Sequence, residues 1–329
     1  SSAASDVYKR QPSIAIDLPM LRIFRIIIAA LFFTGLTLLF LDFTGTVHLY
    51  LGWMAKIQLL PAVLALNFIV IAALLALTFL FGRIYCSVIC PLGILQDIVA
   101  WFGRRKKNRE YKFEKAHNGV RYAALGCFIA LMTAGVSSVA LLVAPYSAFG
   151  RIAQNLFAPI YQAGNDLVVF LAERLGAYSL YTVDIRIASL PTFIIALLTL
   201  ALIATLAWCG GRTWCNTVCP LGTFLGFISH YAWFRPTFVT DRCVRCRMCE
   251  RHCKAACIDI AKQTVDMSRC VACMNCIDRC KLGGIRYRHS PLKFRQLCDA
   301  SMREPCTSIT NDTAHGDANA ASEATNAVS

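Results

Sequence analysis

Four long apolar runs constrain the fold of this chain more than any other feature of its sequence. They occupy residues 23–41, 61–81, 122–143 and 191–208, and each approaches the roughly 20 residues that a helix needs to cross a bilayer. The runs show no amphipathic period, which argues against buried helices of a soluble core. Only 16% of the 329 residues are charged, against about a quarter in a soluble protein. The sequence therefore predicts an all-α membrane domain with four transmembrane helices.

Lysine and arginine are distributed unevenly among the loops between these runs. The first loop holds only Lys56 and the third holds three arginines, whereas the second holds nine basic residues, among them Arg105 and Lys107. Positive residues stay on the cytoplasmic side, so both chain ends and the second loop are predicted to be cytoplasmic in a multi-pass protein of the bacterial inner membrane. The third loop is expected to form interfacial helices at 146–160 and 166–175. The net charge of +14 follows this sorting, so no nucleic-acid partner is predicted.

Two cysteine runs with one shared spacing follow the fourth apolar run. Residues 243–253 read CVRCRMCERHC and residues 270–280 read CVACMNCIDRC, both C-x2-C-x2-C-x3-C. In this pattern three thiolates of a run bind one [4Fe–4S] cluster and the fourth binds the other cluster. Structural zinc prefers two C-x2-C pairs separated by a longer stretch, so two [4Fe–4S] clusters are predicted. The expected ligands are Cys243, Cys246, Cys249 and Cys280 for one cluster, and Cys270, Cys273, Cys276 and Cys253 for the other.

The residues around these runs refine the prediction. Cys257 is an alternative ligand to Cys253, which is favoured because its spacing matches the second run. Lys254 and Lys281 replace the proline that usually follows the fourth cysteine, so a different turn is expected there. Short strands at 257–260 and 263–266 predict a small α+β ferredoxin-like unit. The arginines that crowd the first run form either a solvated basic face or a set of cations that stabilise a reduced cluster or dock an acidic electron partner.

Composition divides the chain into four segments. Residues 1–20 are expected to be partly non-native or disordered, and residues 21–235 to form the transmembrane domain. Residues 236–297 form the two-cluster ferredoxin-like domain, and residues 298–329 are a polar tail that cannot bury a core. The chain contains no C-x-x-C-H haem motif, no G-x-G-x-x-G and no P-loop, which argues against c-type haem and against hydride transfer from a nicotinamide.

A C-x3-C-P motif occurs twice, each time where an apolar run ends. CSVICPLG begins at Cys86 and CNTVCPLG at Cys215, and each copy follows a Gly-Arg pair. The thiols could serve as small packing residues, as a redox pair or as metal ligands. The prolines after the second cysteines can begin new helices, and a helix N-terminus favours a thiolate. The sequence predicts that both motifs converge on one site that relays electrons, using Cys86, Cys90, Cys215 and Cys219.

Polar residues around the first loop are candidates for a quinone site. A quinone head group needs hydrogen-bond donors and a proton acceptor beside lipid, and the loop supplies Asp42, His48, Lys56 and Gln58. The alternative is that these four residues are ordinary interfacial polar groups.

Taken together, the four runs, the two C-x3-C-P motifs and the two-cluster module resemble the NapH/NosR-type membrane polyferredoxins. The resemblance covers roughly residues 21–287 and implies electron transfer between the membrane quinone pool and a partner redox protein in anaerobic respiration. It implies an electron-transfer subunit of a quinol-linked oxidoreductase rather than a stand-alone enzyme. Some members of that family act instead in the maturation of respiratory enzymes or copper sites, so a maturation or regulatory factor is the alternative function.

Overall fold

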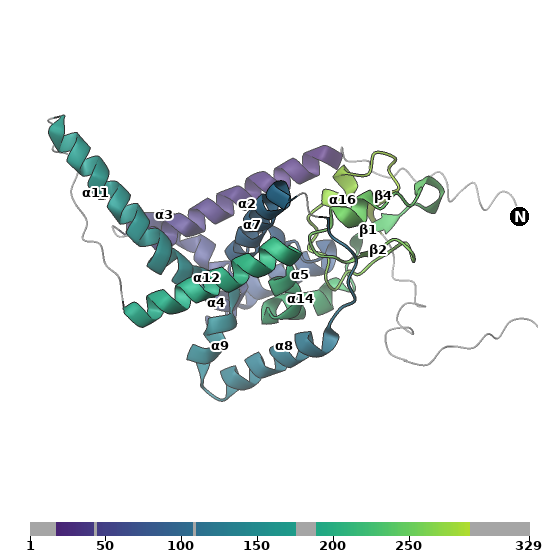
Figure 1. The fold of residues 1–329 in the computed structure, drawn as a ribbon. Coiled ribbons are helices and arrows are strands. Elements are labelled where there is room, and N and C mark those ends of the chain that lie inside the picture. Colours follow the sequence, from purple (N-terminus) through teal and green to yellow (C-terminus); the bar gives the residue numbers. More distant parts are fainter. Residues whose placement is uncertain (1–17, 43–44, 108–109, 176–188, 290–329) are drawn as a thin grey trace, which may run out of the picture. The chain divides into compact units, whose positions relative to one another are not determined.

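A computed structural model of the protein describes residues 18–42, 45–107, 110–175 and 189–289. All of them belong to one compact unit that extends to residue 290 (Figure 1). The predicted tail at 298–329 and most of the segment at 1–20 lie outside the described residues. The division between residues 235 and 236 stays a prediction.

Two helices are long and apolar enough to cross a membrane. They are α2 (Leu18–Leu41) and α12 (Leu190–Gly210), whose most apolar stretches have mean hydropathies of 2.3 and 2.4. Their 24 and 21 residues correspond to lengths of about 36 Å and 32 Å, against a hydrocarbon core of about 30 Å. Both correspond to apolar runs that the sequence predicted as spans.

The other two predicted spans are broken, so in the described residues the structure supports two of the four predicted transmembrane helices. The run 61–81 forms α4 (Leu59–Leu64) and the 14-residue α5 (Phe68–Phe81). Between them Leu66 has a φ of 51°, and the Asn67 amide donates to Ala62 O at 2.9 Å. This is a Schellman helix ending. The chain changes direction there. The 14 residues of α5 alone span only about 21 Å, less than the hydrocarbon core of about 30 Å.

The run 122–143 ends in the same way near its middle. It forms α8 (Asn118–Thr133) and α9 (Ser137–Val143), with Gly135 at a φ of 79° between them. The Val136 amide donates to Leu131 O at 3.0 Å, and the Gly135 amide to Met132 O at 3.3 Å. These two bonds complete another Schellman ending, so the apolar composition of this run does not make one helix.

The remaining helices surround these elements. One irregular helix follows α9, built from α10 (Pro145–Ile152), the π-helical η1 (Ala153–Phe157) and α11 (Ala158–Arg174). It replaces the two separate helices expected at 146–160 and 166–175, although both segments are helical as predicted. The other helices are α3 (Thr46–Lys56), α6 (Tyr85–Val88), α7 (Pro91–Lys107), α13 (Thr213–Thr217) and α14 (Pro220–Ser229).

A small α+β unit contains the two cysteine runs. Strand β1 (Phe234–Phe238) pairs antiparallel with β4 (Ile285–His289), with Phe238 opposite Ile285. Strand β2 (Ile258–Asp259) pairs antiparallel with β3 (Thr264–Val265), as the sequence predicted for these segments. The short helices of the unit are the 3-10 helix η2 (Thr240–Arg242), α15 (Met248–Arg251) and α16 (Asn275–Asp278). Tyr287 Oη donates to Phe81 O at 2.8 Å, which joins the unit to the end of α5.

Two hydrophobic cores lie within the compact unit. The first contains Phe149, Leu92 and Ile203 from the helices, and it continues into the second cysteine run through Val271. The second lies inside the α+β unit and contains Ile258, Ile277 and Ile285 together with five of the cysteines. Because Val271 packs in the first core, that core extends without a break from the apolar helices into the second cysteine run.

Candidate functional site

The two cysteine runs have the same backbone conformation. In the first run Arg245 and Arg247 adopt φ values of 53° and 61°, and in the second run Ala272 and Met274 adopt 48° and 60°. Residues other than glycine rarely adopt a positive φ, so a matched pair in each run indicates one shared loop design. Alternating right- and left-handed residues turn successive backbone N–H groups toward one concavity, which suits an anion.

The cysteine expected to cross from the second run reaches the first. Cys249 is buried, and its ionisation is influenced by both Cys243 and Cys280. The Gly284 amide donates to Cys280 Sγ at 3.2 Å. A Cβ at Gly284 would lie 3.1 Å from Cys243 Cα, so the chain after Cys280 passes directly against the start of the first run. Cys246, the fourth member of this predicted set, is exposed.

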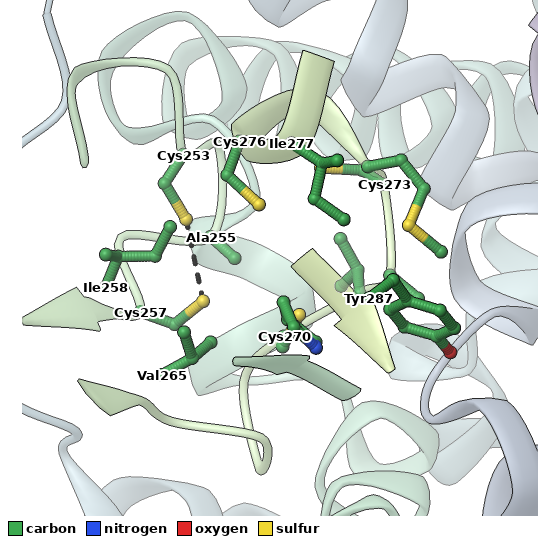
Figure 2. A pocket seen from close by; sticks show the side chains of 14 residues that line it. Cys253, Ala255, Cys257, Ile258, Val265, Cys270, Cys273, Cys276, Ile277 and Tyr287 are labelled. Atoms are coloured by element: carbon green, nitrogen blue, oxygen red, sulfur yellow. Dashed lines mark hydrogen bonds between the residues drawn. The ribbon is translucent and has the colours of Figure 1, made fainter. Parts of the chain in front are cut away.

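The cysteine expected to cross from the first run lies in a pocket with the second. Figure 2 shows Cys253, Cys257, Cys270, Cys273 and Cys276 around this pocket, which is otherwise lined mainly by apolar side chains. Cys253 Sγ and Cys257 Sγ are 3.5 Å apart, and Cys257 also hydrogen-bonds Cys270. The hydrogen bond shared with Cys257 lowers the pKa of the Cys253 thiol below its usual value. The structure thus places both alternative ligands, Cys253 and Cys257, at the same site.

The donor set fits two iron–sulfur clusters. Among the described residues, no group of three or more His, Cys, Asp or Glu side chains is arranged to hold a single metal ion. A cubane binds each of its four thiolates to a different iron, so its ligands do not need the spacing of a one-ion site. The fit instead rests on the eight cysteines, on the crossing of Cys280 and Cys253, and on the matched loops.

The two C-x3-C-P motifs face each other through crossed arginines. Arg83, which precedes the first motif, donates to Cys215 O in the second motif at 3.0 Å. Arg212, which precedes the second motif, donates to Cys86 O in the first. Each arginine also passes over the glycine of the opposite motif: a Cβ at Gly93 would lie 3.0 Å from Arg212 Nη1, and one at Gly222 would lie 2.9 Å from Arg83 Nη2. The repeat therefore builds one site with approximate twofold symmetry.

The structure brings the four motif cysteines within electrostatic range of one another. All four are buried. Cys90 lies within electrostatic range of Cys86 and Cys215, and Cys219 lies within range of the other three. In the second motif Cys219 also begins a new helix, since its Sγ accepts from the Gly222 amide at 3.4 Å. What the four thiols bind stays a prediction.

Buried positive charge surrounds this four-thiol site. Arg83 and Arg212 are both 0% exposed. Arg212 pairs with Asp97 at 2.8 Å, whereas the groups that accept hydrogen bonds from Arg83 are Asn216 Oδ1, Ser268 O and Cys215 O, all of them neutral. A buried charge without a counter-charge costs several kcal/mol. The site is therefore suited to thiolates or to another anionic group beside Arg83.

Asp97 connects the four-thiol site with the second cysteine run. Besides Arg212, this carboxylate pairs with Lys254 at 3.4 Å and with Arg25 of α2 at 3.5 Å. Burial opposes its ionisation, but the charges of Arg212 and Lys254 outweigh burial and hold the pKa of Asp97 well below its usual range. Lys254 directly follows Cys253, and both Lys254 and Arg25 lie within electrostatic range of Cys273. The Gly-Arg pairs are visible in the sequence, but no local pattern predicts the roles of Arg83, Arg212 or Asp97.

The four quinone candidates do not form one site. Asp42 accepts from the His48 amide at 2.9 Å, and Lys56 is exposed. Gln58 is 0% exposed, donates to Ile89 O at 3.2 Å and accepts from Tyr85 Oη at 3.0 Å. This contact corrects the expected topology: a residue predicted for the outer loop touches the first C-x3-C-P motif, which was predicted for the cytoplasmic face, and a bilayer cannot separate two groups in contact.

Comparison with known proteins supports an iron–sulfur assignment. Residues 63–110 and 190–238, which contain the two C-x3-C-P motifs, match the model of a 4Fe–4S binding domain. YccM of Escherichia coli strain K12, which is assigned to electron transport, is 24% identical over 59% of this chain and 47% of its own length. The methylamine utilization ferredoxin-type protein MauN of Methylobacillus flagellatus is 26% identical over 53% and 50%. The chain thus spans about half the length of these curated relatives. No solved structure matches it.

Proposed function

We propose that this protein is an iron–sulfur electron-transfer protein that holds two [4Fe–4S] clusters. One observation carries the proposal: two cysteine runs of the same spacing adopt the same loop, and each sends its fourth cysteine to the other. The proposed ligands are Cys243, Cys246, Cys249 and Cys280, and Cys270, Cys273, Cys276 and Cys253. The ferredoxin-type name of MauN supports it. The match to a 4Fe–4S binding domain lies at residues 63–110 and 190–238, ahead of these eight cysteines, and supports an iron–sulfur role for the chain as a whole. When bound, such clusters supply one-electron transfer.

We further propose that the protein works in the bacterial cytoplasmic membrane and exchanges electrons with quinone. Helices α2 and α12 support membrane insertion. The four-thiol site supports a relay, because its core continues into the second cysteine run through Val271 and Cys273. Among the quinone candidates, Gln58 is the best supported. It accepts a hydrogen bond from Tyr85 Oη and donates to Ile89 O, which lies inside the first motif directly before Cys90 in the sequence.

Cofactor analysis tests the first proposal. Protein purified without oxygen should contain about eight irons with matching acid-labile sulfide per chain if both predicted clusters form. Cys246→Ser should lose about half of that iron, whereas Cys127→Ser should lose none, because Cys127 is an exposed cysteine of α8 that belongs to neither run. Stoichiometric zinc without sulfide would contradict the assignment.

Reduction by quinol in lipid tests the relay. Cys90→Ser should keep the iron and the spectrum of the two ferredoxin-type clusters but lose their reduction by quinol, with Cys127→Ser again as the control. Normal reduction in Cys90→Ser would return the motif cysteines to a packing role. The same assay separates the alternative function, since a maturation or regulatory factor need not turn over quinol at all.

A further inference from the structure

The two cysteine runs share a loop conformation but differ in their surroundings. In the second run Cys270, Val271, Ala272 and Cys276 are buried. Val271 packs in the core that also holds Cys86 and Cys90, and Cys273 packs against that core. In the first run, Cys246 is exposed and Val244 is 67% exposed. The second run therefore faces the four-thiol site, while the first faces away from it toward solvent.

Helix packing also places the second run nearer than the first to the long apolar helix α2. Helix α2 packs against α16 of the second run, and Arg22 of α2 pairs with Asp278 of α16. Helix α15 of the first run packs against α16 and β2. The first run thus lies one layer further from the long apolar helix than the second. Electrons that enter near the four-thiol site would reach the second run before the first.

The exposed surface of the first run combines apolar and basic side chains that alternate along the chain. We name it the first-run face and define it by Arg242, Val244, Arg245, Cys246, Arg247 and Met248, all of them exposed. Arg247 is paired with Glu250 at 2.8 Å. In the part of the chain that the structure describes, Arg242 and Arg245 make no ion pair. Arginine and methionine are both enriched at protein–protein interfaces.

We propose that the first-run face docks a small soluble electron carrier with an acidic surface. This inference rests on the proposed function and names the partner class for its outward end. Charge complementarity favours an acidic partner, since opposite charges steer encounter and fix orientation. Anionic lipid would meet the same charges, but it would cover the exposed Cys246 and isolate the first run from any soluble partner.

Binding of flavodoxin, an acidic electron carrier, tests the docking face without relying on turnover. The full-length iron-loaded protein is placed in zwitterionic lipid nanodiscs, and the dissociation constant is measured at low and at high salt. Arg245→Glu should weaken binding by about tenfold at low salt, and this difference should shrink as salt screens it. Arg288→Glu is the matched control, because Arg288 is an exposed arginine of the same α+β unit on β4. It should change binding by less than about twofold.

Three results would overturn the docking face. The first is that Arg245→Glu and Arg288→Glu weaken flavodoxin binding equally. The second is that the basic protein cytochrome c binds more tightly than flavodoxin. The third is that Arg245→Glu alters only the association of the protein with anionic vesicles. The last result would make the face a lipid-binding surface. Loss of iron and sulfide in the wild-type preparation would instead contradict the proposed function, and it is measured separately from the dissociation constants.

Discussion

At the residue scale, Cys253 and Cys257 are the two candidates for the last ligand of the second set. Both lie in the pocket with Cys270, Cys273 and Cys276. The two sulfurs are 3.5 Å apart, so either thiol can donate a hydrogen bond to the other. Cys253 has the same place in its run as Cys280 has in the second run, so Cys253 is the expected ligand. A hydrogen bond to a ligating sulfur also tunes the potential of a cluster. Cys257 then acts as a positioning residue beside the ligand.

Serine replacement of the two cysteines separates these roles. Cys253→Ser should lower the iron content by about half, because one of the two clusters loses a ligand. Cys257→Ser should keep nearly all the iron but change the midpoint potential of one cluster, because a hydrogen bond to sulfur is altered. Iron analysis and a redox titration followed by electron paramagnetic resonance measure both effects. If Cys257→Ser loses the iron and Cys253→Ser keeps it, Cys257 is the ligand.

At the element scale, the paired helix starts after Cys90 and Cys219 depend on two glycines. Gly93 lies against Cys86 O and Gly222 against Cys215 O, so closely that a Cβ at either glycine would collide with that carbonyl. The same carbonyls accept the hydrogen bonds of Arg212 and Arg83. Each glycine therefore leaves space for the bond that joins the two motifs.

Gly222→Ala should destabilise the protein by roughly 1–3 kcal/mol, because the added methyl group displaces the backbone at a packed site. Gly126→Ala on α8 provides the control. A Cβ there meets nothing within 4 Å, so the higher helix propensity of alanine should leave stability equal or slightly raised. Thermal unfolding in detergent, followed by tryptophan fluorescence, gives the difference in Tm. Equal Tm values for the two variants would show that the backbone at Gly222 has room to move.

The sequence predicted the elements unevenly, and the reasons are physical. The cysteine runs, β2 and β3 followed from local spacing and turn chemistry, which act over a few residues. The breaks within 61–81 and 122–143 did not follow from composition, because an apolar run reads the same whether it forms one helix or two. The signals of a helix break were Asn67 within 61–81, and Gly135 with Ser137 two residues later within 122–143. The crossing of Arg83 and Arg212 depends on contacts between residues 132 and 126 positions apart, which no local pattern encodes.

At the scale of the whole molecule, the α+β unit depends on two different kinds of support. Its own core contains Cys249, Cys253, Cys257, Cys270 and Cys276, so part of that core is completed only when the thiols hold their clusters. Other parts are tied to the helices by side chains. Arg83 and Arg121 donate to Ser268 O at 3.0 and 3.1 Å, and Ser229 donates to Met267 O at 2.8 Å.

Removal of iron should therefore loosen the unit in a specific pattern. After oxidative cluster loss and chelation, amide hydrogen exchange should accelerate in the segment 243–253, which the clusters hold. Exchange should stay slow in α2 and α12. At Met267 and Ser268, which are bonded to the helices, exchange should be slower than in the first run. Mass spectrometry of peptides from the iron-loaded and iron-free protein measures this. Uniform acceleration across all helices would show instead that the clusters stabilise the entire fold.

The crossed arginines have the geometry of an interface between two identical subunits. In a twofold interface residue i of one copy meets residue j of the other, and the same contact occurs a second time with the copies exchanged. Here Arg83 meets Cys215 O and Arg212 meets Cys86 O, with both copies in a single chain. Each motif's cysteine carbonyl accepts its hydrogen bond from the arginine of the other motif, so neither half is complete alone. A half-length ancestor with one motif would have built this site only as a homodimer, and fusion of its two copies would have left each half free to diverge.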